Sequence, residues 1–255
     1  MSIDKLFEIK GRRALVTGAG RGIGKVLALT LAEAGCDVAL FGLHSNYLED
    51  VAEQANKFGV RTLILEGDVS KKADVQKAFQ AIAKDFGRLD ICVNNAGISM
   101  QVPVEDMAEA DWDRLLDVNM KGVFLCSQEA AKLMKPQKNG SIINIGSISA
   151  RTVNVPQKQA VYNTTKAGVV MLTQTMAVEW APYGIRVNSI SPGYMKTEMV
   201  LSSMSKLFPE WESLTPLNRL GEPEELRGAL LYLASDASSY VIGHDLVVDG
   251  GYTIR

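Results

Sequence analysis

A tyrosine and a lysine four residues apart, Tyr162 and Lys166, are the side chains in this sequence best suited to acid–base chemistry. On a helix this spacing places a phenol and an ammonium on one face, one turn apart. A free tyrosine titrates at about pH 10, and a neighbouring Lys⁺ stabilises the phenolate and lowers that pKa. We therefore expect Tyr162 to act as a general acid or base at about pH 7 to 9. The same spacing is also common on exposed helix faces, so the other motifs of the chain decide whether Tyr162 and Lys166 are catalytic.

A glycine-rich segment near the start of the chain is the second chemical signal. Residues 17–24 read TGAGRGIG and lie between an expected strand and an expected helix. Glycines there allow a tight turn and a close approach of the backbone to a pyrophosphate, and the helix N-terminus offers N–H groups to that anion. Four glycines among eight residues exceed what a structural turn needs. This context predicts a dinucleotide-binding loop formed by Gly18, Arg21, Gly22, Ile23 and Gly24.

The choice between NAD and NADP depends on the end of the second expected strand. A carboxylate is expected there in an NAD-binding fold, to hold the ribose hydroxyls. The segment 40–46 reads LFGLHSN and contains none, and Arg21 lies close by in sequence. However, Leu43 occupies the place of an NADP-selecting arginine, while His44, Ser45 and Asn46 can contact either cofactor. The sequence therefore does not choose between NAD and NADP, and it slightly favours NADP.

Short apolar runs alternate with longer helical patterns along the whole chain. This alternation predicts one doubly wound parallel sheet of about seven strands, of the Rossmann type, with helices on both faces. The strands are apolar at both parities, as a doubly covered sheet requires. The expected strands are 13–17, 37–41, 61–66, 89–93, 141–145, 185–190 and 245–248, and the expected helices are 23–34, 47–58, 73–86, 112–134, 161–180 and 224–234. With no linker or repeat, we expect a single domain over residues 1–255.

Composition excludes several classes of function. Lys and Arg total 27 against 29 Asp and Glu, a net charge of −2, so there is no basic excess for nucleic acid. No apolar stretch reaches membrane-spanning length, and the N-terminus lacks a signal-peptide core. Three scattered cysteines and two distant histidines provide no metal site. We expect reduced, buried cysteines, no metal, no membrane or nucleic-acid partner, and a cytoplasmic location.

Taken together, these motifs resemble the short-chain dehydrogenase/reductase family over almost the whole chain. Besides the glycine loop and the Tyr-x-x-x-Lys motif, the resemblance rests on four elements in the family's order. They are Asn94-Asn95-Ala96-Gly97 after the fourth strand, Asn119 in the long helix, a serine ending the fifth strand, and Pro192-Gly193 after the sixth. The resemblance implies an NAD(P)-dependent oxidoreductase that acts on a CH–OH group, and usually a homotetramer.

The resemblance also implies roles for single residues. Tyr162 would exchange a proton with the substrate oxygen, Lys166 would lower its pKa and bind the nicotinamide ribose, and Asn119 would hold a water in the proton relay. Asp68 and Val69 would border the adenine. The remaining cofactor contacts would come from Asn94, Asn95, Gly97, Pro192, Gly193, Met195 and Thr197. Asn94 and Asn119 can also be structural bridges.

The serine that binds the substrate oxygen has two candidates. The family's usual spacing to the tyrosine selects Ser149, whereas alignment on the strand end, Ile143 to Ile145, selects Ser147. We prefer Ser147 because a strand end fixes a position in space while loop lengths vary. Ser149 then joins Asn154 and Gln157 as a substrate contact, because amides bind hydroxyls both as donors and as acceptors. The amides of this loop can equally cap its own backbone.

The substrate is suggested by a closer resemblance to polyol and ketose oxidoreductases, of the arabinitol, mannitol and sorbose reductase type. It rests on residues 154–163, 178–188, 191–195 and 243–251. The expected reaction therefore converts a sugar alcohol to a ketose or back. The segment 194–219 is expected to form a lid over the substrate, although residues 198–215 can equally be an ordinary packed helix pair. The alternatives are a 3-oxoacyl thioester reductase, and an NAD(P)-binding sensor without turnover.

Overall fold

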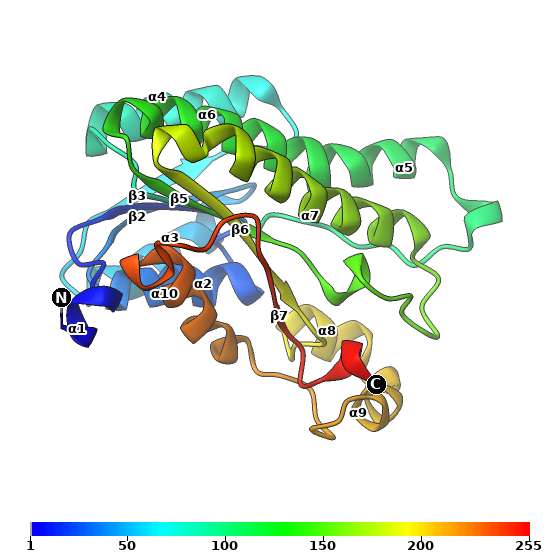
Figure 1. Ribbon diagram of the computed structural model, residues 1–255. Coiled ribbons are helices and arrows are strands. Elements are labelled where there is room, and N and C mark those ends of the chain that lie inside the picture. Colours follow the sequence, from blue (N-terminus) through cyan, green and yellow to red (C-terminus); the bar gives the residue numbers. More distant parts are fainter. Residues whose placement is uncertain (1) are drawn as a thin grey trace.

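The computed structural model describes residues 2–255 and shows seven strands, each followed by helical structure (Figure 1). The strands are β1 (Arg13–Thr17), β2 (Asp37–Gly42), β3 (Thr62–Glu66), β4 (Ile91–Asn94), β5 (Gly140–Ile145), β6 (Ile185–Pro192) and β7 (Asp245–Val248). The helices are α1 (Ile3–Phe7), α2 (Gly22–Glu33), α3 (Ser45–Asn56), α4 (Lys72–Phe86), α5 (Glu109–Leu116), α6 (Gly122–Gln137), α7 (Ala160–Trp180), α8 (Glu198–Ser203), α9 (Phe208–Leu214) and α10 (Arg227–Ala234).

All seven strands form one parallel sheet in the order β3-β2-β1-β4-β5-β6-β7. The chain builds outward from β1 to β3, then crosses back so that β4 lies on the other side of β1. This reversal leaves a crevice beyond the carboxyl ends of β1 and β4, where ligands bind in open α/β sheets. The expected fold class is confirmed.

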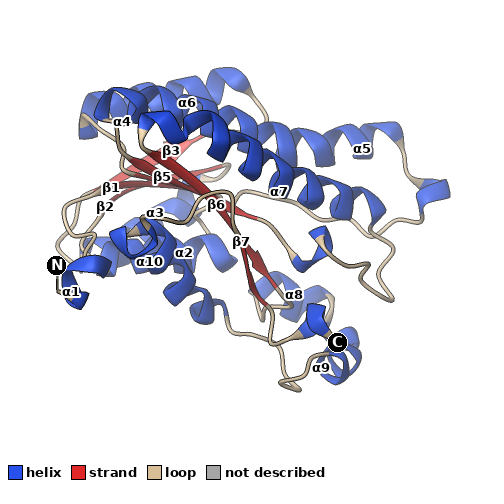
Figure 2. Cartoon of the chain, viewed as in Figure 1, coloured by secondary structure: helices blue, strands red, loops and turns tan. Residues whose placement is uncertain are grey.

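Two helical layers cover the sheet, and they explain why the strands are apolar at both parities (Figure 2). In β1, Ala14 and Val16 pack into the core beneath α2, α3 and α10. Leu15, between them, points to the opposite face and joins the core beneath α4, α6 and α7. Since successive strand residues point to opposite faces, each strand contributes to both cores.

The long helix expected at 112–134 is interrupted. A π-helical segment, Asp117–Lys121, joins α5 to α6 and contains the buried side chain of Asn119. A π-helical turn inserts one extra residue per turn and rotates the side chains that follow it. The hydrophobic periodicity that predicted one continuous helix does not reveal this insertion.

The segment 194–219 carries two short helices, α8 and α9, within the range where a helix pair was one of the two expectations. They lie below the carboxyl ends of β6 and β7, next to the C-terminus (Figure 1). Thr197 caps α8 through its Oγ1, which accepts a hydrogen bond from the Val200 N–H at 3.4 Å. Trp211 of α9 is 1% exposed, so this segment has its own packed interior.

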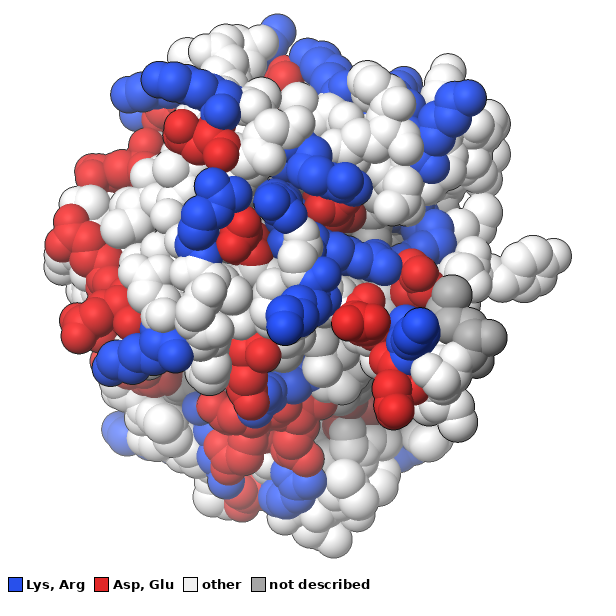
Figure 3. Space-filling model, turned by 90° about the vertical axis from the view of Figure 1, so that its left-hand side faces the viewer, with Lys and Arg blue, Asp and Glu red and all other residues white. Residues whose placement is uncertain are grey.

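Charged side chains are mixed on the face that carries the N-terminal side of the molecule (Figure 3). Lys and Arg are interspersed there with Asp and Glu. Asp37, for example, forms ion pairs with both Arg13 and Arg61, at 3.6 and 2.9 Å. This face therefore offers no continuous basic surface to a polyanion. Within residues 2–255, no helix is both long and apolar enough to cross a membrane.

Candidate active site

A cleft of about 1030 Å³ opens at the carboxyl ends of the strands. The glycine loop, the ends of β4 and β5, the start of α7 and the segment after β6 form its walls. The cleft brings together nearly all of the residues predicted for the site. They are Gly18, Arg21, Gly22, Ile23, Gly24, Asp68, Val69, Asn95, Gly97, Ser147, Ser149, Asn154, Gln157, Tyr162, Lys166, Pro192, Gly193, Met195 and Thr197.

Asn94 is one exception, since it lies inside the sheet rather than on the cleft. Its Nδ2 donates to Ser127 Oγ and to Asn144 Oδ1, both at 2.8 Å, and its side chain is buried. The prediction that Asn94 contacts the cofactor does not agree with this position, because these bonds use both of its amide protons. Asn95 takes the place beside the glycine loop, where its Nδ2 donates to the Thr17 and Gly18 carbonyls.

Asn119 is the other exception, because its side chain is buried behind the cleft wall. Its Oδ1 accepts from the Ile98 N–H at 2.8 Å, and its Nδ2 donates to the Ile98 carbonyl and to Thr165 Oγ1, at 2.9 and 3.1 Å. Thr165 lies in α7 between Tyr162 and Lys166. The amide therefore joins the loop after β4 to the helix that carries the proposed acid–base pair.

The glycine loop has the shape needed to hold a pyrophosphate. Gly18 and Gly22 have φ of +63° and +55°, which favours glycine. A Cβ at Gly24 would lie 2.1 Å from the Gly18 carbonyl oxygen, so no side chain fits there. α2 starts at Gly22, and no N-cap side chain occupies its first N–H groups. A nucleotide cofactor fits this cradle, with an unblocked helix N-terminus facing the anion.

Arg21 lies at the other end of the cradle, against a residue that sequence reasoning missed. Its guanidinium carbon is 6.0 Å from the centre of the Tyr47 ring, and His44 meets the same ring edge-on at 5.9 Å. No ion pair found among residues 2–255 includes Arg21. Leu43 is 58% exposed, and no carboxylate lies between Gly42 and Tyr47. These groups can accept an additional phosphate on the ribose.

Tyr162 and Lys166 occupy adjacent turns at the start of α7, with the lysine Nζ 5.7 Å from the centre of the phenol ring. Lys166 is 5% exposed, and its Nζ donates to the Ile145 carbonyl at 2.8 Å. Burial lowers the pKa of Lys166 to about 8. Burial also raises the pKa of Tyr162, while the hydrogen bond with Ser147 acts in the opposite direction.

This electrostatic balance differs from the expectation that Lys166 lowers the tyrosine pKa. Removing the phenol from water penalises the phenolate, and that effect exceeds the gain from the Ser147 hydrogen bond. The phenol in this structure is therefore protonated at neutral pH. It is ready to donate a proton, and to take one it would need further stabilisation of the phenolate.

The structure distinguishes the two candidate serines by their hydrogen bonds. Ser147 follows β5, and its hydroxyl bonds to the Tyr162 phenol and accepts from the Ser149 N–H at 3.1 Å. The Ser149 hydroxyl instead donates to Asn154 Oδ1 at 2.6 Å and accepts from Gln159 Nε2 at 3.2 Å. Of the two serines, Ser147 is thus the one next to Tyr162, the proposed acid–base residue, where alignment on the strand end had placed it.

The predicted substrate contacts belong to a neutral polar wall. The Asn154 Oδ1 accepts from Ser149 and Gln159, and its Nδ2 donates to the Tyr194 hydroxyl at 3.0 Å. Burial raises the pKa of Tyr194, so this phenol stays uncharged. Tyr194, Gln159 and Trp211 complete the wall. Tyr194 and Trp211 belong to the segment expected to form the lid, but their partners in the wall are distant in the chain and could not be read from the sequence.

Comparison with known proteins agrees with this geometry. A family model described as enoyl-(acyl carrier protein) reductase matches residues 18–253. A sorbose reductase of Candida albicans is 43% identical over 97% of this chain and 89% of its own length. A probable NADP-dependent mannitol dehydrogenase of Yarrowia lipolytica is 41% identical over 98% of this chain and 91% of its own. A short-chain type dehydrogenase/reductase from Mycobacterium marinum superposes with a TM-score of 0.97, at 45% identity, over 100% of both chains.

The predicted family and enzyme class are thereby confirmed. The match covers the cradle for the nucleotide, the serine, tyrosine and lysine beside it, and the segment after β6. The chain belongs to the short-chain dehydrogenase/reductase family of NAD(P)-dependent oxidoreductases.

Proposed function

We propose that this enzyme interconverts a sugar alcohol and a ketose, with NADP as the favoured cofactor. The observation that carries the proposal is the neutral wall of hydroxyl and amide groups beside Tyr162. Ser149, Asn154, Gln159 and Tyr194 all line the cleft, and none of them is charged. Groups of this kind both donate to and accept from substrate hydroxyls. The relatives named sorbose reductase and mannitol dehydrogenase support the same substrate class.

The cofactor residues follow from the cradle. NAD(P), when bound, supplies the hydride or accepts it. The glycine loop and the N-terminus of α2 hold the pyrophosphate, and Arg21 beside Tyr47 holds the ribose phosphate of NADP. Thr197 faces the loop from across the cleft, since a Cβ at Gly22 would lie 3.7 Å from its Cγ2. Met195 and Thr197 hold the carboxamide in this proposal, and Lys166 binds the nicotinamide ribose.

In this proposal Tyr162 is the residue that exchanges a proton with the substrate oxygen. In ketose reduction its phenol donates a proton to the substrate oxygen while Ser147 donates a hydrogen bond to the same oxygen. In alcohol oxidation the phenolate takes the proton back, so oxidation should accelerate as the pH rises. Lys166 lies on the same side of α7, and its ammonium, whose pKa is about 8, favours that phenolate only while it stays protonated. Asn119 supports the proton relay through its hydrogen bonds to the Ile98 backbone and to Thr165 Oγ1.

The proposal also covers the domain, the lid and the assembly of the chain. Residues 1–255 act as a single domain, and the segment 194–219 covers the substrate as a lid. Four copies of the chain assemble in the cytoplasm. Exposed apolar side chains on α5 to α7 suit such an assembly: Trp112 is 42% exposed, Phe124 43% and Met171 61%. Sedimentation of the purified protein as a monomer would contradict the assembly.

The experiment follows nicotinamide absorbance with NADH and NADPH in parallel. Ketoses, simple ketones and an acetoacetyl thioester are the substrates, and sugar alcohols test the reverse direction. Reduction of a ketose with NADPH is the expected result. Turnover of the thioester alone would assign the enzyme to acyl-chain reduction, and cofactor binding without any turnover would favour a sensor.

A further inference from the structure

Gln157 lies where three parts of the chain meet around the substrate end of the cleft. It is in the loop that precedes α7, and it faces Tyr194 after β6 and Trp211 in α9. The Tyr194 and Trp211 rings stack with their centres 4.0 Å apart and their planes 4° from parallel. Gln157 and Trp211 are 8% and 1% exposed, so their polar atoms must find partners within the protein.

The number of protons at this junction fixes the orientation of the amide. Asn154 Nδ2 donates to the Tyr194 hydroxyl, whose single proton then goes to Gln157 or to Tyr252, so the donor that decides the amide orientation is Trp211. The Trp211 Nε1–H can only donate. With its oxygen toward both rings, Gln157 accepts from Tyr194 Oη at 3.1 Å and from Trp211 Nε1 at 3.0 Å, and its Nε2 donates to the Val155 carbonyl at 3.0 Å.

In this arrangement the Gln157 oxygen accepts two hydrogen bonds, and its Nε2 donates one of its two protons to the loop backbone. The amide therefore ties the loop to α9, and its second Nε2 proton is left for a ligand in the cleft that Gln157 lines. Val155 and Asn154 belong to the loop, whereas Trp211 belongs to the proposed lid. A single side chain thus joins the loop wall of the cleft to the helix that covers it.

We propose that Gln157 is a positioning residue that latches α9 onto the substrate wall through Trp211 and Tyr194. The inference rests on the proposed function for the identity of the substrate, but not for the latch itself. With the latch closed, the Tyr194 hydroxyl has its proton directed at Gln157 and its lone pair at Asn154. The Asn154 amide in turn has one orientation, because its oxygen faces Ser149. Gln157 thereby fixes which wall groups donate and which accept.

The latch predicts a specific kinetic signature. Loss of one buried hydrogen bond corresponds to about a fivefold to tenfold change in an equilibrium constant. Gln157→Met and Trp211→Phe should each raise KM for the ketose by about that factor. Neither variant touches the cradle or Tyr162, so kcat and the Kd for NADPH should change by less than about twofold. Trp211→Phe keeps an aromatic ring against Tyr194 but also leaves a small void at a buried site, so Gln157→Met is the variant that removes the bond with the lesser change in volume.

A double variant that combines Gln157→Met with Trp211→Phe distinguishes a specific latch from a general loosening of the fold. Both substitutions remove the same hydrogen bond, so the double variant should have the KM of Gln157→Met alone. Trp180→Phe is the matched control, since Trp180 packs at the far end of α7, away from the cleft. A double-variant KM equal to the product of the two single effects would overturn the latch, as would an unchanged KM in Gln157→Met.

A second measurement needs no substrate and tests the latch even if the substrate class is wrong. Amide hydrogen exchange across Phe208–Leu214 should accelerate in Gln157→Met and in Trp211→Phe, but not in Trp180→Phe. Unchanged exchange in α9 would overturn the latch. In contrast, absence of ketose turnover by the wild-type enzyme would refute only the proposed function, because the exchange result would still decide the role of Gln157.

Discussion

At the scale of single residues, the account depends on the phenol of Tyr162. Tyr162→Phe removes the proton that the substrate oxygen exchanges, while the ring and its packing remain. We expect kcat to fall by about 10³-fold, within the usual range for loss of a general acid. The Kd for NADPH, measured by fluorescence, should not change. Retention of more than about a tenth of the activity would exclude Tyr162 as the acid–base residue.

The two serines make a second prediction at this scale. Ser147 bonds to the Tyr162 phenol, whereas Ser149 is bonded to Asn154 and Gln159. Ser147→Ala should therefore lower kcat by about 10²-fold, as expected for loss of a donor to the developing oxyanion. Ser149→Ala is the matched comparison, and its main effect should be on KM. The reverse order in kcat would transfer the catalytic role to Ser149.

Arg21 makes a prediction about cofactor choice. Its guanidinium packs near Tyr47 and has no carboxylate partner in the part of the chain described. Arg21→Met should raise the Kd for NADPH by about tenfold, the value of one charge-assisted hydrogen bond, and leave that for NADH nearly unchanged. Lys25→Met is the control, because Lys25 pairs with Asp50 outside the cleft. Equal losses with both cofactors would contradict the assignment.

Residues whose partners are near in sequence were predictable, and those with distant partners were not. The glycine loop and the Tyr162–Lys166 pair work through local geometry, so their spacing was informative. Tyr47 faces Arg21 only because α3 folds back beside the glycine loop. Trp211 meets Gln157 only because the chain after β6 returns over the cleft. For Asn94 the sequence left a cofactor contact and a structural bridge open, and the packing shows that its amide forms the bridge.

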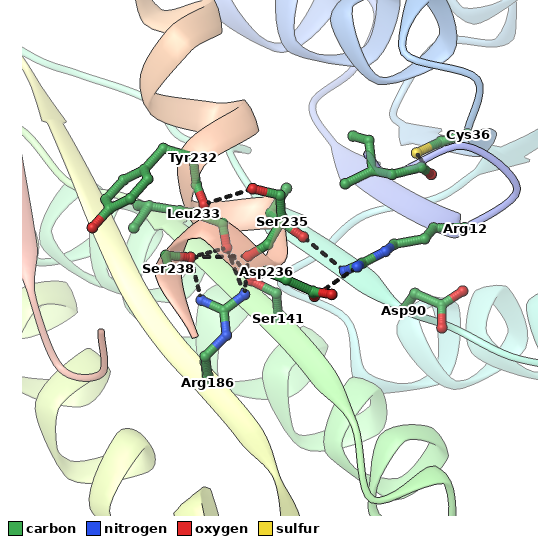
Figure 4. Close-up of polar contacts among 12 residues, drawn as sticks. Arg12, Cys36, Asp90, Ser141, Arg186, Tyr232, Leu233, Ser235, Asp236 and Ser238 are labelled. Carbon is green, nitrogen blue, oxygen red and sulfur yellow. Dashed lines mark hydrogen bonds and ion pairs between the residues drawn. The ribbon is translucent and has the colours of Figure 1, made fainter. Parts of the chain in front are cut away.

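At the scale of elements, two arginines stabilise the C-terminus of α10 (Figure 4). Arg186 donates to the Leu233 and Ser235 carbonyls, at 2.9 and 3.1 Å, and Arg12 donates to the Ala234 carbonyl at 3.1 Å. The last carbonyls of a helix have no partner within it and carry a partial negative charge. The guanidinium groups supply both the missing donors and the opposite charge.

Arg186→Met should destabilise the fold by about 2 to 3 kcal/mol, because buried carbonyls lose their charged donors. Urea unfolding measures this change. Arg227→Met serves as the control, since Arg227 pairs with Glu33 on the surface, where an ion pair contributes less than about 1 kcal/mol. Equal destabilisation by the two substitutions would contradict the capping role of Arg186.

Element positions were predicted better than the interruptions within them. The strands lie within about two residues of their expected bounds because buried parallel strands leave apolar runs. The π-helical turn at Asp117–Lys121 was missed, since one inserted residue barely changes the periodicity of a long helix. The bounds of α8 and α9 were not predicted, because helices of 6 and 7 residues produce too short a pattern.

At the scale of the whole molecule, the order of the strands creates the site. The sequence predicted parallel strands by their alternation with helices, but not their spatial order. That order places β1 beside β4, so the glycine loop meets Asn95 and Gly97 at the reversal of the sheet. It also places β5 beside β6, so Ser147 faces the chain that continues to Tyr194 and the lid. Side chains from segments far apart in the sequence therefore converge on one cleft.

The most direct test of the central claim is the oxidation of NADPH by this enzyme in the presence of a ketose. The account predicts ketose-dependent loss of nicotinamide absorbance, faster with NADPH than with NADH, and its reversal when the sugar alcohol and NADP⁺ are supplied instead. Turnover of an acetoacetyl thioester with no turnover of any ketose would contradict it.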